Sequence, residues 1–269
     1  MKKLSVTICF LIICTYCHAQ ANYKEKTVFK NEDVEFRQID KHTWHGNGHL
    51  VYNESLYLIE GDESAILLDA GTHIPGLRKI VEDIVKKPVT LVLTHAHADH
   101  AGTAINEWDS LWVNAAEAAI IPEGMYKGKT LYLTDGQVFE LGNRMIEVVF
   151  TPGHTPGSTS FIDKTSHYGF SGDAFGSTNL LVSTDLSTQI ATCQRIARFI
   201  KQYKINFFYP GHYWGDNFET PQRIKDVEEI CEGILNGTLS PTTVNNNNYL
   251  PYIVEKYGVK VNYGTSQKR

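Results

Sequence analysis

The sequence is poor in cysteine. It has five cysteines in 269 residues, and Cys9, Cys14 and Cys17 all lie near its start. Only Cys193 and Cys231 remain for the rest of the chain. Two cysteines so far apart in sequence exclude a disulfide-rich scaffold, and a single disulfide between them stays open because nothing in the sequence fixes their distance.

Sustained hydrophobicity is also lacking outside the first residues. Residues 1–19 carry two lysines, an apolar core and then small residues, which indicates a secretory signal peptide with cleavage after Ala19 or Ala21. The apolar stretch is short for a membrane anchor. Large residues precede Cys14 and Cys17, which makes a lipoprotein the less favoured alternative. We therefore expect an exported protein, periplasmic or secreted, without a stable membrane span.

Positive charge is scarce as well. Without Lys2 and Lys3 of the signal peptide, 25 basic residues become 23 against 30 acidic ones, so the exported chain would carry a net charge of −7. An acidic chain with no basic run argues against nucleic acid and leaves a small-molecule substrate as the expected partner. No Gly-x-Ser-x-Gly nucleophile pattern occurs. The sequence leaves the oligomeric state open.

Histidine, by contrast, is concentrated in one segment. Residues 95–100 read His-Ala-His-Ala-Asp-His and follow the apolar, β-branched run of residues 88–94, which predicts a buried strand. Residues two apart on an extended segment point the same way, so His95 and His97 can hold one metal ion. Asp99 and His100 then turn into the next segment and can face a second ion. Uncompensated, so many polar groups at a strand end would carry a desolvation cost.

Further ligand-type residues follow strands downstream. His154 lies in the turn Thr-Pro-Gly-His-Thr-Pro-Gly, Asp173 follows Ser-Gly after a short apolar run, and His212 follows Pro-Gly after another. Upstream, Asp69 ends the strand predicted for residues 64–69 and begins Asp-Ala-Gly. Ligands that follow separate strands in this way can meet at one place in a fold.

This set of motifs resembles the metallo-β-lactamase-fold hydrolase superfamily, in its dinuclear, glyoxalase II-like branch. The resemblance runs from about Val51 to His212. It implies an α/β fold, an αββα sandwich of two sheets flanked by helices, and we expect a single domain over residues 22–269. It also implies that Asp69 fixes nearby backbone or a ligand histidine rather than binding metal, with a turn cap as the alternative.

The family pattern further implies a ligand set. His95, His97 and His154 would hold a first metal, and Asp99, His100 and His212 a second, with Asp173 bridging both. Imidazole and carboxylate ligands without thiolate suit two zinc ions, with iron or manganese as alternatives. A shared water would act as a bridging hydroxide nucleophile, and Asp99 would orient it or carry its proton. The predicted protein is a zinc-dependent hydrolase of an ester, thioester, lactone or lactam.

Two other activities stay open. In zinc β-lactamases one subclass has cysteine at the position of Asp173 and lacks a histidine ligand at that of His100, and another keeps the histidine but has serine at the position of Asp173. The presence of both His100 and Asp173 therefore favours thioesterases and lactonases over a β-lactamase proper. Mononuclear iron persulfide dioxygenases share the histidine cluster and would make the protein an oxidoreductase. Export, and the lack of a clear counterpart to the basic glutathione-binding patch of glyoxalase II, argue against a glutathione thioester as substrate.

The remaining sequence predicts the local structure around these motifs. We expect a polar, extended lead-in over residues 22–40, and at residues 43–49 a Gly-rich segment that in related hydrolases forms a hairpin over the site. His45 and His49 within it are expected not to bind metal. Asp135-Gly136 and Gly142-Asn143 are hairpin signals. Helical segments are predicted at residues 75–87, 101–108, 115–121, 188–203 and 222–235.

Overall fold

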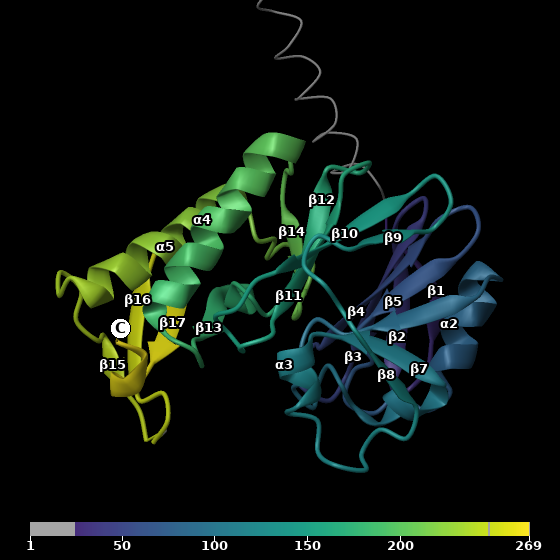
Figure 1. Ribbon diagram of the computed structural model, residues 1–269, viewed down its shortest axis with the longest axis horizontal. Coiled ribbons are helices and arrows are strands. Elements are labelled where there is room, and N and C mark those ends of the chain that lie inside the picture. The colour runs from purple at the N-terminus through teal and green to yellow at the C-terminus, as the bar shows by residue number, and fades with distance from the viewer. Residues whose placement is uncertain (1–24, 247, 269) are drawn as a thin grey trace, which may run out of the picture.

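The computed structural model describes residues 25–246 and 248–268. The predicted signal peptide and its cleavage sites lie outside these residues, so export stays a prediction. Figure 1 shows two large sheets face to face, with helices on the outer sides of the pair and a small third sheet beside the last two long helices.

The first large sheet has eight strands whose order in space follows their order in sequence. Strands β1 to β5 run antiparallel to their neighbours, whereas β5 to β8 run parallel. The strands are β1 (Lys26–Lys30), β2 (Val34–Asp40), β3 (Thr43–Gly48), β4 (Ser55–Glu60), β5 (Ala65–Leu68), β6 (Val89–Val92), β7 (Ser110–Val113) and β8 (Lys129–Tyr132).

The second large sheet has five strands in the order β14-β12-β11-β10-β9, and only the β12–β14 pair is parallel. Its strands are β9 (Val138–Glu140), β10 (Met145–Phe150), β11 (Thr159–Asp163), β12 (Tyr168–Gly172) and β14 (Phe208–Pro210). A third sheet, ordered β13-β17-β16-β15, consists of β13 (Asn179–Leu181), β15 (Thr243–Val244), β16 (Tyr252–Lys256) and β17 (Val259–Tyr263).

Helices cover the outer faces of the two large sheets. They are α2 (Leu77–Val85), α3 (Ala115–Ala118), α4 (Leu186–Tyr203) and α5 (Pro221–Leu235), with 3₁₀ turns η1 (Thr103–Glu107), η2 (Gly176–Thr178) and η3 (Thr265–Gln267). Figure 1 shows α2 beside the eight-stranded sheet and α4 on the far side of the five-stranded one. This is the αββα arrangement that the sequence predicts. That residues 22–269 form one domain stays a prediction.

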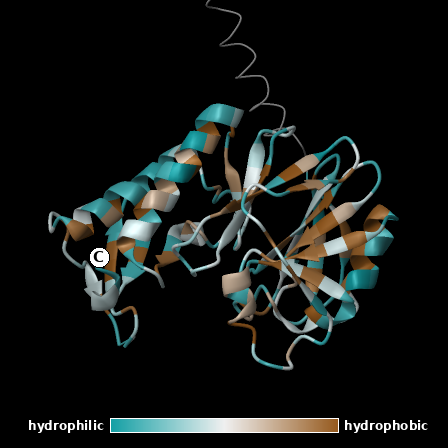
Figure 2. Cartoon of the chain, viewed as in Figure 1, coloured by the Kyte–Doolittle hydropathy of each residue, from teal (hydrophilic) through white to brown (hydrophobic). Residues whose placement is uncertain are grey.

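The alternation of side chains along β4 explains how the layers hold together. Tyr57 and Ile59 pack between the two large sheets, whereas Leu56 and Leu58 face the layer that contains α2. Both faces of this strand are buried, so residues 56–59 form a continuous apolar run. Along α4 and α5 hydrophobic and hydrophilic residues alternate (Figure 2), and the apolar ones form a separate core with the outer face of the five-stranded sheet and with the third sheet.

Several local predictions are wrong, and the first concerns the amino-terminal strands. Residues 26–40 form the hairpin β1–β2 rather than an extended lead-in. Val34 and Phe36 are completely buried in the core that contains α2, while the residues between and directly after them, Glu35 and Arg37, are polar. The predicted hairpin at residues 43–49 is instead strand β3, paired on both sides; the connection that follows it, residues 49–54, is where the chain turns.

Two further predictions fail because of contacts distant in sequence. Residues 101–108 form only the short turn η1, because Gly102 N and Thr103 N donate to carbonyls of residues 71 and 72 instead of to helical partners. Asp135-Gly136 is not a hairpin, since β8 lies in one sheet and β9 in the other. The hairpin at Gly142-Asn143 is confirmed, with both residues at positive φ as a tight turn requires.

The carboxyl-terminal region and the cysteines complete the fold. The tail after residue 245 adds two strands to the third sheet. Cys193 on α4 and Cys231 on α5 are buried, free thiols, so the structure contains no disulfide between them. Among the described residues, none of the helices combines the length and hydropathy needed to cross a bilayer.

Candidate metal centre

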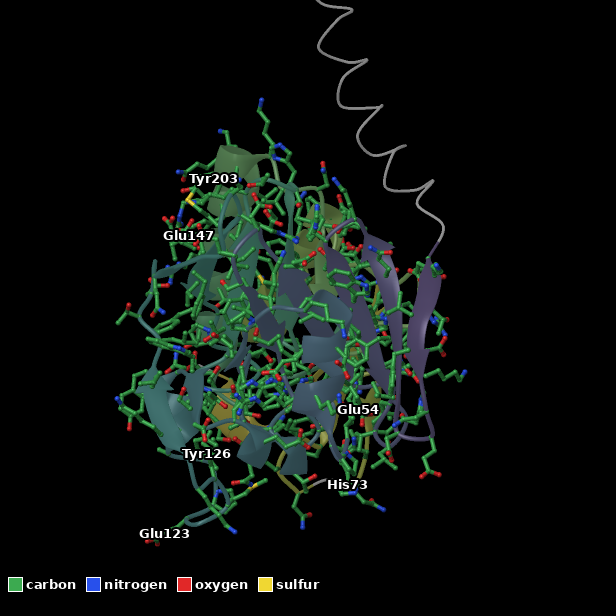
Figure 3. All side chains as sticks on the ribbon, turned by 90° about the vertical axis from the view of Figure 1, so that its right-hand side faces the viewer. Glu54, His73, Glu123, Tyr126, Glu147 and Tyr203 are labelled. Carbon is green, nitrogen blue, oxygen red and sulfur yellow. The ribbon has the colours of Figure 1, made fainter. Side chains whose placement is uncertain are left out.

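The candidate site lies at one end of the sandwich, where several strands finish. Residues 93–100 follow β6, Asp173 follows β12, and His212 follows β14. Because β12 and β14 are parallel neighbours, Asp173 and His212 leave the sheet at the same edge. The backbones of His212 and Glu54 form an isolated β-bridge. Figure 3 shows Glu54 towards the opposite end of the molecule from Tyr203, the last residue of α4.

One group of histidines forms the first part of the centre. His95 Nε2 lies 3.1 Å and His154 Nε2 lies 3.0 Å from His97 Nδ1. Three ring nitrogens from two separate loops therefore converge on one point, as a metal site requires. We refer to His95, His97 and His154 as the first group.

Asp99, His100 and His212 form the second group. Asp99 Oδ2 lies 3.8 Å from His100 Nε2 and 3.5 Å from His212 Nε2. Asp173 lies between the groups: one of its oxygens is 3.6 Å from His154 Nε2 and 3.3 Å from His212 Nε2, and the other is 3.6 Å from His100 Nε2. The structure thus brings all seven predicted ligands together.

Hydrogen bonds on the far side of His100, His154 and His212 set the orientation of these three rings. Nδ1 of His154 donates to the carbonyl of Leu181 at 3.0 Å, and Nδ1 of His212 donates to that of Tyr52 at 3.1 Å. Nδ1 of His100 donates to Asp69 at 2.9 Å. In the neutral form of each ring, these bonds place the proton on Nδ1 and leave the Nε2 lone pair directed into the centre, which is the tautomer that binds a metal.

Asp69 connects the two groups from behind. It is buried, and besides His100 it accepts hydrogen bonds from the backbone N–H and the hydroxyl of Thr94, both at 2.7 Å. The Thr94 hydroxyl in turn accepts from Nδ1 of His95 at 3.0 Å. Asp69 therefore contacts both nearby backbone and a histidine of the centre, the two alternatives that the sequence offered for a supporting role. Its φ of 64° lies in the left-handed region, which is strained for an aspartate.

The electrostatics of the centre suit a cation. Burial lowers the pKa of His95 well below its usual range and lowers that of His154 to about 4, so both rings are neutral and able to bind metal. Burial also opposes the charged form of His100, but the Asp173 and Asp69 carboxylates outweigh it and raise its pKa to about 10. Burial would raise the pKa of Asp173, yet His100 and His212 hold it well below its usual range.

Two buried atoms show that the residues fit a metal. His100 Nε2 and Asp173 Oδ1 lie 3.6 Å apart, are inaccessible, and have no hydrogen-bond partner among the described residues. Unpaired buried polar atoms cost free energy. A divalent cation between them would satisfy both, and the nitrogen and oxygen donor set is one that zinc, iron and manganese accept.

His45 and His49, the two aromatic residues after His212 and the loop of residues 122–128 lie outside the two groups. His45 is buried against Ser55, and burial lowers its pKa to about 3; His49 is exposed. Tyr213 packs in the core, whereas Trp214 is half exposed and lines a polar cavity of about 140 Å³ together with Arg37 and Asn53. The loop of residues 122–128 packs against the helical layer, where Tyr126 donates to the Trp108 carbonyl.

Two glutamates near the centre were not predicted from the sequence. Glu117 of α3 is completely buried and accepts hydrogen bonds from the backbone of residues 96 and 157. Glu219 is also buried, and it accepts from Ser177 N, while the Ser177 hydroxyl accepts from the backbone N–H of His212. Burial raises the pKa of Glu219 to about 8. The available signal for Glu117 was a single acid among alanines in a short helical segment.

An αββα sandwich with a histidine and aspartate centre at its strand ends defines a class of metal-dependent proteins. The sequence profile of the Metallo-beta-lactamase superfamily matches residues 50–212, and the chain belongs to this superfamily. It is a hydrolase of that superfamily with a candidate metal centre, and the predicted fold is confirmed.

Similar proteins include enzymes from distant organisms. The chain is 26% identical over 202 residues to an acyl-coenzyme A thioesterase, MBLAC2, of Homo sapiens. The match covers 59% of this chain and 72% of that protein. It is 29% identical over 192 residues to a hydroxyacylglutathione hydrolase of Neisseria meningitidis, covering 70% and 73%. A solved metallo-beta-lactamase from Pontibacter korlensis superposes with a TM-score of 0.62 at 20% identity, covering 74% of this chain and 99% of that one, and supports the fold.

Proposed function

We propose that this protein is an exported, dinuclear metal-dependent hydrolase that cleaves a thioester or a related acyl bond. The position of Asp173 carries the proposal. One of its oxygens lies 3.6 Å from a nitrogen of the first group and 3.3 Å from a nitrogen of the second. A single carboxylate within reach of both groups is what a bridged pair of metal ions requires, whereas a mononuclear site would need only one group.

The residues have separate roles in this chemistry. Two bound divalent ions, zinc in the first place, would supply a hydroxide nucleophile near neutral pH and polarise the substrate carbonyl. His95, His97 and His154 would hold one ion, and Asp99, His100 and His212 the other. One carboxylate oxygen of Asp99 lies 3.5 Å from His212 Nε2, within the second group. Its second oxygen can orient a water molecule or take its proton.

A thioester is the first substrate class to test. Two of the similar proteins are named as an acyl-coenzyme A thioesterase and a hydroxyacylglutathione hydrolase, at 26% and 29% identity. The ligand set, with both His100 and Asp173, supports the same choice over a β-lactam. Esters, lactones and β-lactams share the acyl carbon that a hydroxide attacks, so they belong in the same assay panel.

The test is turnover by the purified protein of a panel containing an acyl thioester, an acyl-homoserine lactone, a nitrophenyl ester and nitrocefin. We expect hydrolysis of at least one class, its loss after exhaustive dialysis against a chelator, and its recovery on addition of zinc. No hydrolysis in any class, with one iron bound per chain, would overturn the proposal in favour of a persulfide dioxygenase.

Export has its own test. Fractionation of the native host with an antibody against the protein should place it outside the cytoplasm. The amino terminus of the mature chain should be Gln20 or Asn22, as cleavage after Ala19 or Ala21 would give. A full-length cytoplasmic protein that begins at Met1 would contradict this part of the proposal.

A further inference from the structure

The buried carboxylate of Glu117 connects the two loops that carry the first group. One of its oxygens accepts the backbone N–H of Ala96 at 2.8 Å, and the other accepts that of Gly157 at 2.7 Å. Ala96 lies between His95 and His97, and Gly157 lies three residues after His154. Each oxygen therefore holds the backbone next to ligands that belong to the first group.

The surroundings of Glu117 make this connection rigid. The carboxylate has no exposed surface, so it depends on the two backbone N–H groups for stabilisation. Asn114 caps the start of α3 by accepting from Ala116 N at 2.9 Å, which fixes the helix that carries Glu117. A Cβ atom on residue 157 would lie 2.7 Å from Glu117 Cγ, so a glycine is needed for so close an approach.

We infer that Glu117 is the positioning residue of the first group: it holds the two loops in the one relative placement in which the three ring nitrogens converge. This inference rests on the proposed function. It concerns the first group alone, because the rings of the second group are oriented by different partners, Asp69 for His100 and the Tyr52 carbonyl for His212. Loss of the two hydrogen bonds to Glu117 should therefore weaken the binding of one of the two metal ions and not that of the other.

The variant E117Q tests this selectively. It keeps the size of the side chain but replaces one acceptor oxygen by an NH₂ group, so one of the two backbone N–H groups faces a donor. A supporting residue behind a metal site typically changes metal affinity by about ten- to a hundredfold. In zinc titrations of the apoprotein with a competing chelator, we expect one ion to be weakened by that factor and the other to bind as in the wild type.

The chain offers a matched control in Glu107. Its two oxygens also accept two backbone N–H groups, from Gly76 at 2.7 Å and Arg78 at 2.8 Å, but the segment that they hold carries no ligand of the centre. E107Q should also lower stability to urea, by less than E117Q because Glu107 is only partly buried, and should leave both zinc affinities unchanged. This comparison separates positioning of the metal site from a general loss of stability.

Combining E117Q with a variant that disables one of the two groups shows which metal ion binds more weakly. When His212→Ala disables the second group, E117Q should still weaken the remaining ion about ten- to a hundredfold. When His97→Ala disables the first group, E117Q should add little. The reverse pattern, equal affinities in E117Q and wild type, or an equal loss of affinity in E107Q, would each overturn the inference.

The outcome is distinguishable from failure of the proposed function. If the wild-type protein binds fewer than two zinc ions, the dinuclear proposal itself fails. If E117Q does not fold, Gly157→Ala provides a second variant, because its methyl group must displace Glu117 from the same backbone. It should reproduce the selective loss of one ion, and unchanged binding of both ions in that variant would overturn the inference.

Discussion

Replacing Asp69 by alanine should lower the affinity for the metal ion held by the second group, and the size of the effect follows from the structure. The substitution removes the acceptor of the His100 Nδ1 hydrogen bond, which is 2.9 Å long and buried. A hydrogen bond to a charged group contributes about 1.5–3 kcal/mol. Each 1.4 kcal/mol corresponds to a factor of ten in affinity. The second ion should therefore bind roughly ten- to a hundredfold more weakly.

The same substitution should also destabilise the apoprotein, because the N–H and hydroxyl of Thr94 lose their buried acceptor as well. We expect a loss of about 3 kcal/mol or more in the free energy of unfolding by urea. Zinc affinity is measured by competition with a chelator of known affinity. Two measurements on one variant thus separate the support of His100 from the support of the backbone.

Asp185→Ala is the control for this experiment. Asp185 also accepts from the backbone N–H and the hydroxyl of one threonine, Thr188, at 2.8 and 2.9 Å, but among the described residues no imidazole hydrogen-bonds to it. It should cost about 1 kcal/mol as a lost helix cap and leave zinc binding intact. If Asp69→Ala bound both ions as tightly as Asp185→Ala, the account of Asp69 as an orienting residue would be wrong.

Two other predictions concern stability. The folded protein keeps a proton on Glu219 up to about pH 8, whereas the unfolded chain releases it near its ordinary pKa of 4.5, so the free energy of unfolding should fall as pH rises between these values. Glu219→Gln should remove this contribution, about 1.4 kcal/mol per pH unit, from the pH dependence of the free energy of unfolding, measured with urea at pH 5 to 9. The same pH dependence in the variant and in the wild type would refute the prediction. In the wild type the buried Asp163 carboxylate lies 2.8 Å from the Arg144 guanidinium. Arg144→Met removes this charge partner and should lower the free energy of unfolding by about 3–5 kcal/mol, and the double variant Arg144→Met/Asp163→Asn should recover part of that loss. Turnover per folded molecule should not change, and a denaturation midpoint equal to that of the wild type would show that this ion pair contributes nothing.

The ligands of the centre could be predicted because each one is marked by its neighbours in sequence. A histidine or aspartate that directly follows an apolar run and a Gly-containing turn is placed at a strand end, and β12 and β14 bring two such ends together. Glu117 had no comparable mark. Its two partners lie 21 and 40 residues away in sequence, so its role exists only in the folded chain.

The fold shows the same division between local and distant determinants. The amphipathic pattern of α2 buries Leu77, Val81 and Val85, and the helix was predicted within two residues at either end. Residues 101–108 also suit a helix, but the backbone of Gly102 and Thr103 is held by the loop after β5. At Asp135-Gly136 the turn chemistry was recognised, but which sheet each neighbouring strand joins depends on packing that the turn does not encode.

The most direct test of the account is the metal content of the purified wild-type protein and of its Asp173→Ala variant, measured by elemental analysis after removal of loosely bound ions. Because Asp173 is the one carboxylate among the described residues of the centre that lies within 3.6 Å of ring nitrogens of both groups, the account predicts two divalent ions per wild-type chain and fewer than two, with no hydrolysis, in the variant. A wild-type protein that binds a single ion, or a variant that keeps two ions and full turnover, would contradict it.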